Sequence, residues 1–226
     1  TLDSSGGEDT RMYFDKSARA FRAGSVDGTQ WDTPGNYSFA TGFNTTASGA
    51  ASTAIGNSTT ASGAGSFAAG GTPVPGGVPA PIASGNFSTA MGVSTTASGD
   101  SSTAIGTSSS ASGYTSTAMG ASTMASGDFS VAMGNSTIAS ADYSTAMGYD
   151  TTASGEASTA MGWEARVSGD RSMAIGLGDP AGAPSGWPIV SGNDSLGIFM
   201  GDQSGVDVSS GNTMAVLGGD FVVGSP

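Results

Sequence analysis

A repeat of 14 residues constrains this chain more than any other feature, and it runs from Ser38 to Gly176. One half of the unit reads Ser-x-Ala-x-Gly, and the other half reads Thr/Ser-x-Ala-Ser-Gly. Copies of the first half begin at Ser38, Ser52, Ser66, Ser88, Ser102, Ser116, Ser130, Ser144, Ser158 and Ser172. Self-similarity at a fixed period indicates an architecture of stacked repeats.

Each half of the repeat has room for a strand but not for a helix. About seven residues fit a strand of about five residues and a tight turn at glycine. Recurring glycine, without an apolar face at the helical period, excludes a helix. We therefore predict an all-β fold, a parallel β-roll solenoid of 14-residue coils with two short strands in each. Backbone N–H and C=O groups would pair with the coils above and below.

Strand alternation assigns the inner faces of the predicted roll. Ser52 and Ala54 share one face of the first strand, and Thr59 and Ala61 share one face of the second. Both sets are small, so they can face each other inside a narrow roll that has no room for large side chains. The buried hydroxyls must then bond to one another or to the backbone, because an unpaired one is costly.

The outward faces of the two strands differ in character. The second strand carries Thr and Ser, whereas the first carries Thr followed two residues later by Met or Ile. We expect the latter to form an unbroken stripe about 40 Å long, at about 4.8 Å per coil. The stripe consists of Ile55, Met91, Ile105, Met119, Met133, Met147, Met161 and Ile175.

A stripe of this size usually marks an interface, and burying each Met or Ile contributes about 1.5–3 kcal/mol. We therefore predict that copies of the chain associate along it, with their coil axes side by side. The alternative is that residues 177–226 fold back over the stripe within one chain.

These residues resemble the head repeat of the trimeric autotransporter adhesins, the YadA-like family. The Ser-x-Ala-Ile/Met-Gly motif, the 14-residue period and the Ala-Ser-Gly half all match, across residues 38–176. The resemblance implies a left-handed roll, a homotrimer with the Met/Ile stripe as its interface, and a place in an extracellular fibre. The same repeat also looks like modules of phage tail fibres.

Composition excludes several classes of function. The absence of Cys and His removes disulfides, thiolate metal sites and the Ser-His triad. A net charge of −12 argues against binding to nucleic acid. No apolar run approaches the roughly 18 residues that a membrane helix needs, so no membrane insertion is expected. We expect no enzyme and no cofactor, and we interpret a chain that begins with Thr1 as an internal segment of a longer exported protein.

Short β caps are predicted at both ends of the roll of residues 38–176. Residues 1–37 form the first, a β-hairpin with strands at 13–15 and 20–22. Residues 177–226 form a Gly/Pro-rich linker that ends the regular roll, followed by a region of short strands. Those strands are expected at 196–200, 214–217 and 221–223.

A Pro-rich loop at 71–84 interrupts the roll, because one half-repeat there is eight residues too long. Proline cannot continue a ladder, so the extra residues should bulge out at a turn. The loop is either a receptor contact, through Pro75 and Pro79, or a tolerated surface insertion.

Two further sets of residues are candidates for binding. Asp128, Asp142, Glu156 and Asp170 lie on consecutive coils, where stacking would place like charges about 5 Å apart. A bound cation such as Ca²⁺, pairing with Arg166 and Arg171, or simple solvation would each relieve the repulsion. Tyr149 and Trp163 also stack on successive coils, as do Phe129 and Tyr143, either as a receptor or glycan contact or as ordinary packing.

The leading functional prediction is a non-enzymatic module of an extracellular trimeric fibre that mediates adhesion to a host-surface protein or glycan. A structural spacer of a phage tail fibre or surface filament is the alternative. An ice-binding solenoid is a third hypothesis, since the Thr and Ser rows could form a flat array, although Met124, Ile138 and Arg166 interrupt it.

Overall fold

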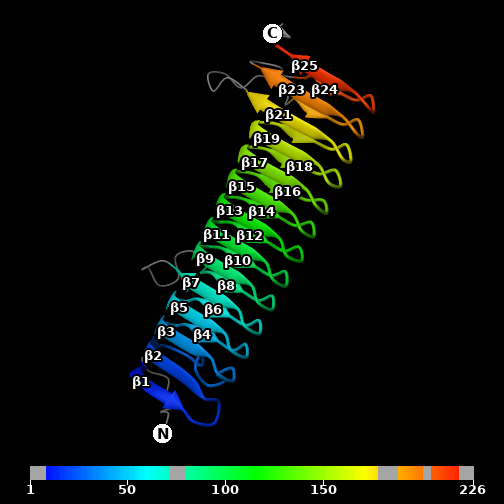
Figure 1. The fold of residues 1–226 in the computed structure, drawn as a ribbon. Helices are drawn as coiled ribbons and strands as arrows, with labels where there is room; N and C mark the ends of the chain where they lie inside the picture. Colours follow the sequence, from blue (N-terminus) through cyan, green and yellow to red (C-terminus); the bar gives the residue numbers. More distant parts are fainter. Residues whose placement is uncertain (1–8, 72–79, 178–187, 201–204, 219–226) are drawn as a thin grey trace, which may run out of the picture. The chain divides into compact units, whose positions relative to one another are not determined.

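The computed structural model describes residues 9–71, 80–177, 188–200 and 205–218. These residues form strands and turns (Figure 1), and no helix long and apolar enough to cross a membrane occurs among them. The chain divides into two compact units, residues 1–121 and 122–226. Pro75, Pro79 and the strand expected at 221–223 lie outside the described residues.

Each unit is a parallel β-solenoid in which every coil contributes one strand to a wide sheet and one to a narrow sheet. In the first unit the wide sheet has the order β1-β2-β3-β5-β7-β9-β11-β13. Its strands are β1 (Asp9–Asp15), β2 (Ala20–Val26), β3 (Phe39–Phe43), β5 (Thr53–Asn57), β7 (Phe67–Gly70), β9 (Thr89–Val93), β11 (Thr103–Thr107) and β13 (Thr117–Ala121). The narrow sheet contains β4 (Thr46–Ala47), β6 (Thr60–Ala61), β8 (Ile82–Ala83), β10 (Thr96–Ala97) and β12 (Ser110–Ala111).

The second unit repeats this arrangement. Its wide sheet contains β15 (Val131–Asn135), β17 (Thr145–Tyr149), β19 (Thr159–Trp163), β21 (Met173–Leu177), β23 (Leu196–Met200) and β25 (Met214–Leu217). Its narrow sheet contains β14 (Met124–Ala125), β16 (Ile138–Ala139), β18 (Thr152–Ala153), β20 (Arg166–Val167), β22 (Ile189–Val190) and β24 (Asp207–Val208). The all-β parallel solenoid predicted from the repeat is therefore confirmed.

The second strand of each coil is shorter than the expected five residues, because turns close in on both sides of it. Ser58, with φ 56°, begins the turn that precedes β6. After β6, the N–H groups of Ser62 and Gly63 both donate to the carbonyl oxygen of Ala83. Two donors at one acceptor end the ladder, so only Thr60 and Ala61 pair as a strand.

Small side chains fill the interior, as the alternation predicted. Ser52, Ala54, Thr59 and Ala61 are fully buried, and the same positions are buried in coil after coil of both units. Alanine, serine and threonine are the largest side chains that most coils admit between the two sheets. Hydrophobic burial inside the roll is consequently modest in each coil.

The buried hydroxyls satisfy the expectation of hydrogen bonding only in part. Ser88 Oγ donates to the carbonyl oxygen of Gly85 at 2.6 Å, and Ser130 does the same to Gly127. Ser52 Oγ has no partner although the same turn is present, since the Ser52 N–H bonds to the Gly49 carbonyl. A change of rotamer would give it that acceptor. The hydroxyls of Thr45, Thr59, Thr95, Thr123, Thr137 and Thr151 also lack a partner among the described residues.

Strands β1 and β2 of the N-terminal segment form a hairpin, and β2 joins the roll with a charged residue in the core. β1 pairs with β2 in antiparallel register, and β2 pairs with β3 in parallel, with Arg22 opposite Ala40. The buried Arg22 guanidinium donates to Ser38 Oγ at 2.8 Å and to the Ala47 carbonyl at 3.0 Å. Burial lowers the pKa of Arg22. Trp31 is also buried and donates from Nε1 to the Thr45 carbonyl.

The long half-repeat leaves the ladders intact on both sides of it. β7 stays in register with β9, with Gly70 opposite Gly92. β8 pairs with β6 and β10, with Ile82 opposite Thr60 and Thr96. The coils on the two sides of this long half-repeat therefore keep their register.

The roll does not end at residue 176, which corrects the expectation of a separate C-terminal region. β22 pairs with β20, and β23 pairs with β21, so Ile189 follows Arg166 and Leu196 follows Met173 in the same register. Composition misled the prediction, because larger apolar residues replace the repeat motif while the coil geometry persists. The described part of the tail therefore stacks onto the second unit and does not fold back over its wide sheet.

Glycine at the end of each wide-sheet motif is required by close approach of the coils. Gly106 has φ +121°, and a Cβ there would collide with the backbone carbonyl oxygen of Gly120 in the next coil. A Cβ at Gly99, in the other half of the repeat, would come as close to the carbonyl oxygen of Gly113, but Gly99 has no positive φ. The fold also accepts a Cβ at the equivalent position of the second unit, which is occupied by Ala141.

We predict that Gly106→Ala lowers the free energy of unfolding by about 3 kcal/mol or more, because a strained φ and a backbone collision add together. The matched control Gly99→Ala should cost clearly less. Urea denaturation followed by circular dichroism measures both. Equal losses in the two variants would contradict this explanation.

The turns place non-glycine residues in the left-handed region of backbone conformation. A substitution that suits this conformation should relieve the backbone strain there. Thr115 is exposed with φ 54°, a conformation that is costly for a β-branched residue and acceptable for asparagine. We predict that Thr115→Asn raises stability by about 1 kcal/mol, whereas Thr96→Asn, in strand β10, lowers it. Thermal unfolding of the two variants tests the sign, and destabilisation by Thr115→Asn would contradict it.

Candidate functional site

The outward face of the wide sheet carries the apolar residues predicted from the sequence, in two rows. In each wide-sheet strand from β3 onward the first and third residues point outward, as Thr53 and Ile55 do in β5. In β2 the equivalent positions are Phe21 and Ala23. The third-position row of the first unit contains Ile55, Ala69, Met91, Ile105 and Met119 in consecutive register. Ile55 and Met91 are 36% and 39% exposed in the single chain.

The expected unbroken stripe is wrong at one coil between Ile55 and Ile175, and the coil that precedes Ile55 does not extend the stripe. Thr41 lies opposite Ile55 on one side, and Ala69 lies opposite it on the other. At both coils the bulk has moved to the first position, where Phe39 and Phe67 stand in the place of threonine. The repeat motif does not specify these outward positions, so this exchange was not predicted.

The second unit keeps large residues in the third position throughout. Met133, Met147, Met161, Ile175, Ile198 and Val216 follow one another in register. Met133 is 38% exposed, so the tail does not cover it within one chain. The alternative of a fold-back by residues 177–226 is therefore contradicted for the described part of the tail.

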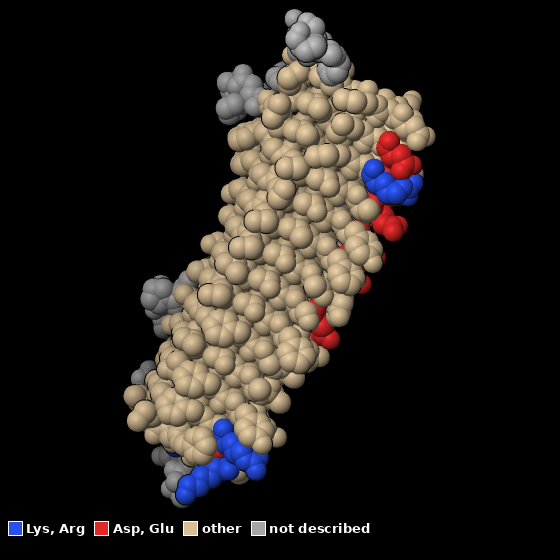
Figure 2. All heavy atoms as spheres, viewed as in Figure 1, with Lys and Arg blue, Asp and Glu red and all other residues tan. Residues whose placement is uncertain are grey.

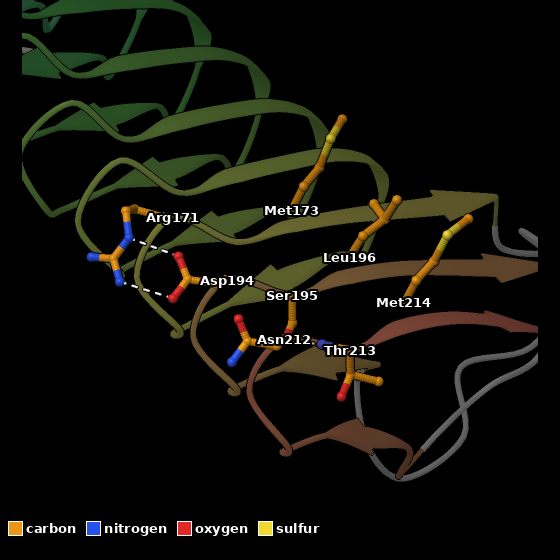
Figure 3. Close-up of a pocket in the computed structure, with 8 residues that line it drawn as sticks. All are labelled: Arg171, Met173, Asp194, Ser195, Leu196, Asn212, Thr213 and Met214. Atoms are coloured by element: carbon orange, nitrogen blue, oxygen red, sulfur yellow. Dashed lines mark hydrogen bonds and ion pairs between the residues drawn. The ribbon is translucent and has the colours of Figure 1, made fainter.

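The last coils of the second unit form a hollow that the sequence did not predict. An open hollow of about 540 Å³ is lined by Arg171, Met173, Asp194, Ser195, Leu196, Asn212, Thr213 and Met214 (Figure 3). Met173, Leu196 and Met214 follow one another in the first-position row, where most other coils of this unit carry threonine. The sheet face is thus apolar at both outward positions here, and alignment of the coils by register would have revealed it.

The carboxylate row has a structural role that was not among the expected outcomes. Asp142 accepts a hydrogen bond from the backbone N–H of Asp128 at 2.9 Å, and Asp170 accepts one from Glu156 at 3.0 Å. In the first unit Asp100 does the same for Asn86. Each such carboxylate joins its turn to the preceding coil, and no group of three potential metal ligands occurs in the described part of the chain.

The two arginines near this row pair with other acids. Arg171 forms a bidentate pair with Asp194, at 2.7 and 2.9 Å, and Arg166 lies 3.7 Å from Asp150. The hydrogen bonds from Arg171 lower the pKa of Asp194, and the same bonds raise the pKa of Arg171. In the view of Figure 2 acidic side chains are few, and most of the surface shown is uncharged.

The predicted aromatic stacks are present in the second unit. The rings of Tyr149 and Trp163 lie 4.2 Å apart between centroids, and those of Phe129 and Tyr143 lie 5.3 Å apart. Tyr143 is 58% exposed. Phe129 and Tyr143 lie at turns, whereas Tyr149 and Trp163 are the last residues of strands β17 and β19. Both pairs remain candidates for receptor contact, together with Pro75 and Pro79.

The repeat, the small-residue interior and the outward apolar rows define the class of the protein, a parallel β-solenoid of short coils. The family model for the YadA head domain repeat matches residues 47–71, 83–109, 111–137, 125–151, 139–165 and 153–178. The chain belongs to this family, an adhesin-type structural domain and not an enzyme family. No curated protein matches the chain.

We predict that the Arg171–Asp194 pair makes stability depend on acid pH. The pKa of Asp194 is lowered in the fold, so its contribution is present above the unfolded pKa of about 4 and disappears as pH falls through the folded value. Wild type should therefore exceed Arg171→Gln in thermal midpoint near neutral pH, with the difference vanishing in acid.

Salt provides the control for this prediction. Both side chains are exposed, so about 1 M salt should shrink the difference at neutral pH. An advantage of wild type that persists unchanged in acid would show that Arg171 acts through packing and not through the carboxylate.

Proposed function

We propose that this chain is a non-enzymatic module of an extracellular trimeric fibre that mediates adhesion or receptor binding. Three copies associate through the outward face of the wide sheet, with their coil axes side by side. The observation that most directly supports this proposal is the apolar face itself, which the single chain leaves exposed at Ile55, Met91 and Met133.

The energetics favour association. The interior of each coil is mostly alanine, serine and threonine, so the roll buries little apolar surface on its own. Each Met or Ile of the outward row contributes about 1.5–3 kcal/mol when it is fully buried. The trimer interface consists of Ile55, Met91, Ile105, Met119, Met133, Met147, Met161 and Ile175, together with the phenylalanines of the Ala69 and Thr41 coils.

Receptor contact falls on the surfaces that association leaves free. The narrow sheet presents a mostly polar face, with Thr60, Thr96 and Ser98 outward. The ends of strands β17 and β19 add the Tyr149–Trp163 stack, and the Pro-rich segment adds Pro75 and Pro79. Three copies of such a surface would bind a repetitive host protein or glycan with avidity.

We predict that Met119→Asp converts a three-chain assembly into single chains, because a buried unpaired carboxylate costs several kcal/mol in each copy. Ser98→Asp adds the same charge on the exposed face of the narrow sheet and should leave the mass unchanged. Size-exclusion chromatography with light scattering measures both. A monomeric wild type would refute the assembly.

A structural spacer of a phage tail fibre or surface filament is the second candidate function. The regular, uniform coils favour it, since most turns carry only small residues. A screen of the intact trimer against matrix proteins, glycans and whole cells separates the two candidates. A spacer binds none of them, whereas an adhesin binds at least one and loses that binding with Tyr149→Ala, Trp163→Ala or replacement of Pro75 and Pro79.

A further inference from the structure

The large outward side chains of the wide sheet follow two alternative patterns in the first unit. One pattern places threonine at the first outward position and Ile or Met at the third. The other places phenylalanine first and a small residue third. The first pattern occurs at Thr53/Ile55, Thr89/Met91, Thr103/Ile105 and Thr117/Met119, and the second at Phe21/Ala23, Phe39/Thr41 and Phe67/Ala69.

The Phe67/Ala69 coil is enclosed by coils of the other pattern. Phe67 lies between Thr53 and Thr89 in the ladder, and Ala69 lies between Ile55 and Met91. The summed volume of the two outward side chains is similar in the two patterns. At this coil, however, the larger side chain stands at the first outward position, two residues before the position that it has in the neighbouring coils. Neither Phe67 nor Ala69 is buried in the single chain.

A surface made of near-identical coils has a register problem when copies associate. A slip by one coil repeats almost every contact and loses only those at the ends. Slipped copies also leave unpaired ends that recruit further chains, which leads to open assemblies instead of closed rings. A coil that differs from the coils on either side of it removes this degeneracy for a slip of one coil, because it no longer matches the coil that it would then face.

We propose that the Phe67/Ala69 coil sets the register in which copies of this chain pack, and that Phe39/Thr41 reinforces it. The proposal rests on the self-association proposed above. In a ring of three the contacts are heterologous, which means that two different patches of the surface meet. The proposal places the first-position row of one chain against the third-position row of the next. Phe67 of one copy then fills the space above Ala69 of its neighbour, at the same level.

A slip of one coil would break this match twice. Phe67 would face Ile55 or Met91 of the neighbour, which overpacks the contact. Ala69 would face threonine, which leaves a cavity. The occupant that this complementary pattern fits is a second copy of the chain, parallel and level with the first, because bulk at Phe67 is matched by a small residue at Ala69 in the same coil.

A permuted variant tests the proposal without changing composition. Phe67→Thr, Ala69→Ile, Thr103→Phe and Ile105→Ala together move the distinctive coil to a new level. This variant should form three-chain assemblies on its own. Refolded together with tagged wild type, it should give mixed assemblies at least about tenfold below the statistical fraction, as native mass spectrometry counts them.

The matched control exchanges residues within one pattern. The double variant Ile55→Met with Met91→Ile leaves both coils with threonine at the first outward position and Ile or Met at the third. It should therefore mix statistically with wild type. A second test variant, Phe67→Thr with Ala69→Ile, only makes this coil resemble its neighbours, so it should fold. It too should be excluded from wild-type assemblies.

The outcomes separate the two proposals. Three-chain wild type with free mixing of either test variant would overturn the register proposal and leave the assembly standing. A wild type that is monomeric would overturn both. The register proposal is supported if both test variants are excluded from wild-type assemblies while the control variant mixes freely with wild type.

Discussion

The closeness of neighbouring coils is the constraint on which the rest of this structure depends. Ala54 and its equivalents are fully buried between two sheets that admit little more than a methyl or hydroxymethyl group. Gly106 has no space even for a methyl group, because the backbone of the next coil occupies it. Large apolar side chains are therefore displaced to the outside, and the outward face of the wide sheet becomes the place where further burial can occur.

The repeat made the interior predictable to a large extent. Period, strand alternation and the small residues at Ser52, Ala54, Thr59 and Ala61 together specify which atoms face inward, and the structure agrees. The length of the second strand was not predictable in the same way. It depends on the turn at Ser58 and on two N–H groups that share the Ala83 carbonyl, neither of which leaves a compositional signal.

For the candidate sites, the sequence predicted which residues lie side by side better than it predicted the interactions that their side chains make. The stacks of Tyr149 on Trp163 and of Phe129 on Tyr143 follow directly from the period. The partner of Asp142 does not, because a carboxylate that reaches the backbone of the preceding coil depends on the rise between coils. The Phe67/Ala69 exchange was missed because the motif does not specify outward positions. The tail coils were missed because the motif residues themselves change there, with Gly197 and Phe199 at the positions of Ala174 and Gly176.

Methionine oxidation measures the central claim most directly, that copies of the chain cover the wide sheet. Met133 on that sheet and Met124 on the narrow sheet are exposed to similar extents in the single chain, 38% and 45%. With dilute peroxide and peptide mass spectrometry, the account predicts that Met124 is converted to sulfoxide rapidly while Met91 and Met133 are protected. Equal oxidation of Met124 and Met133 in the native protein would contradict it.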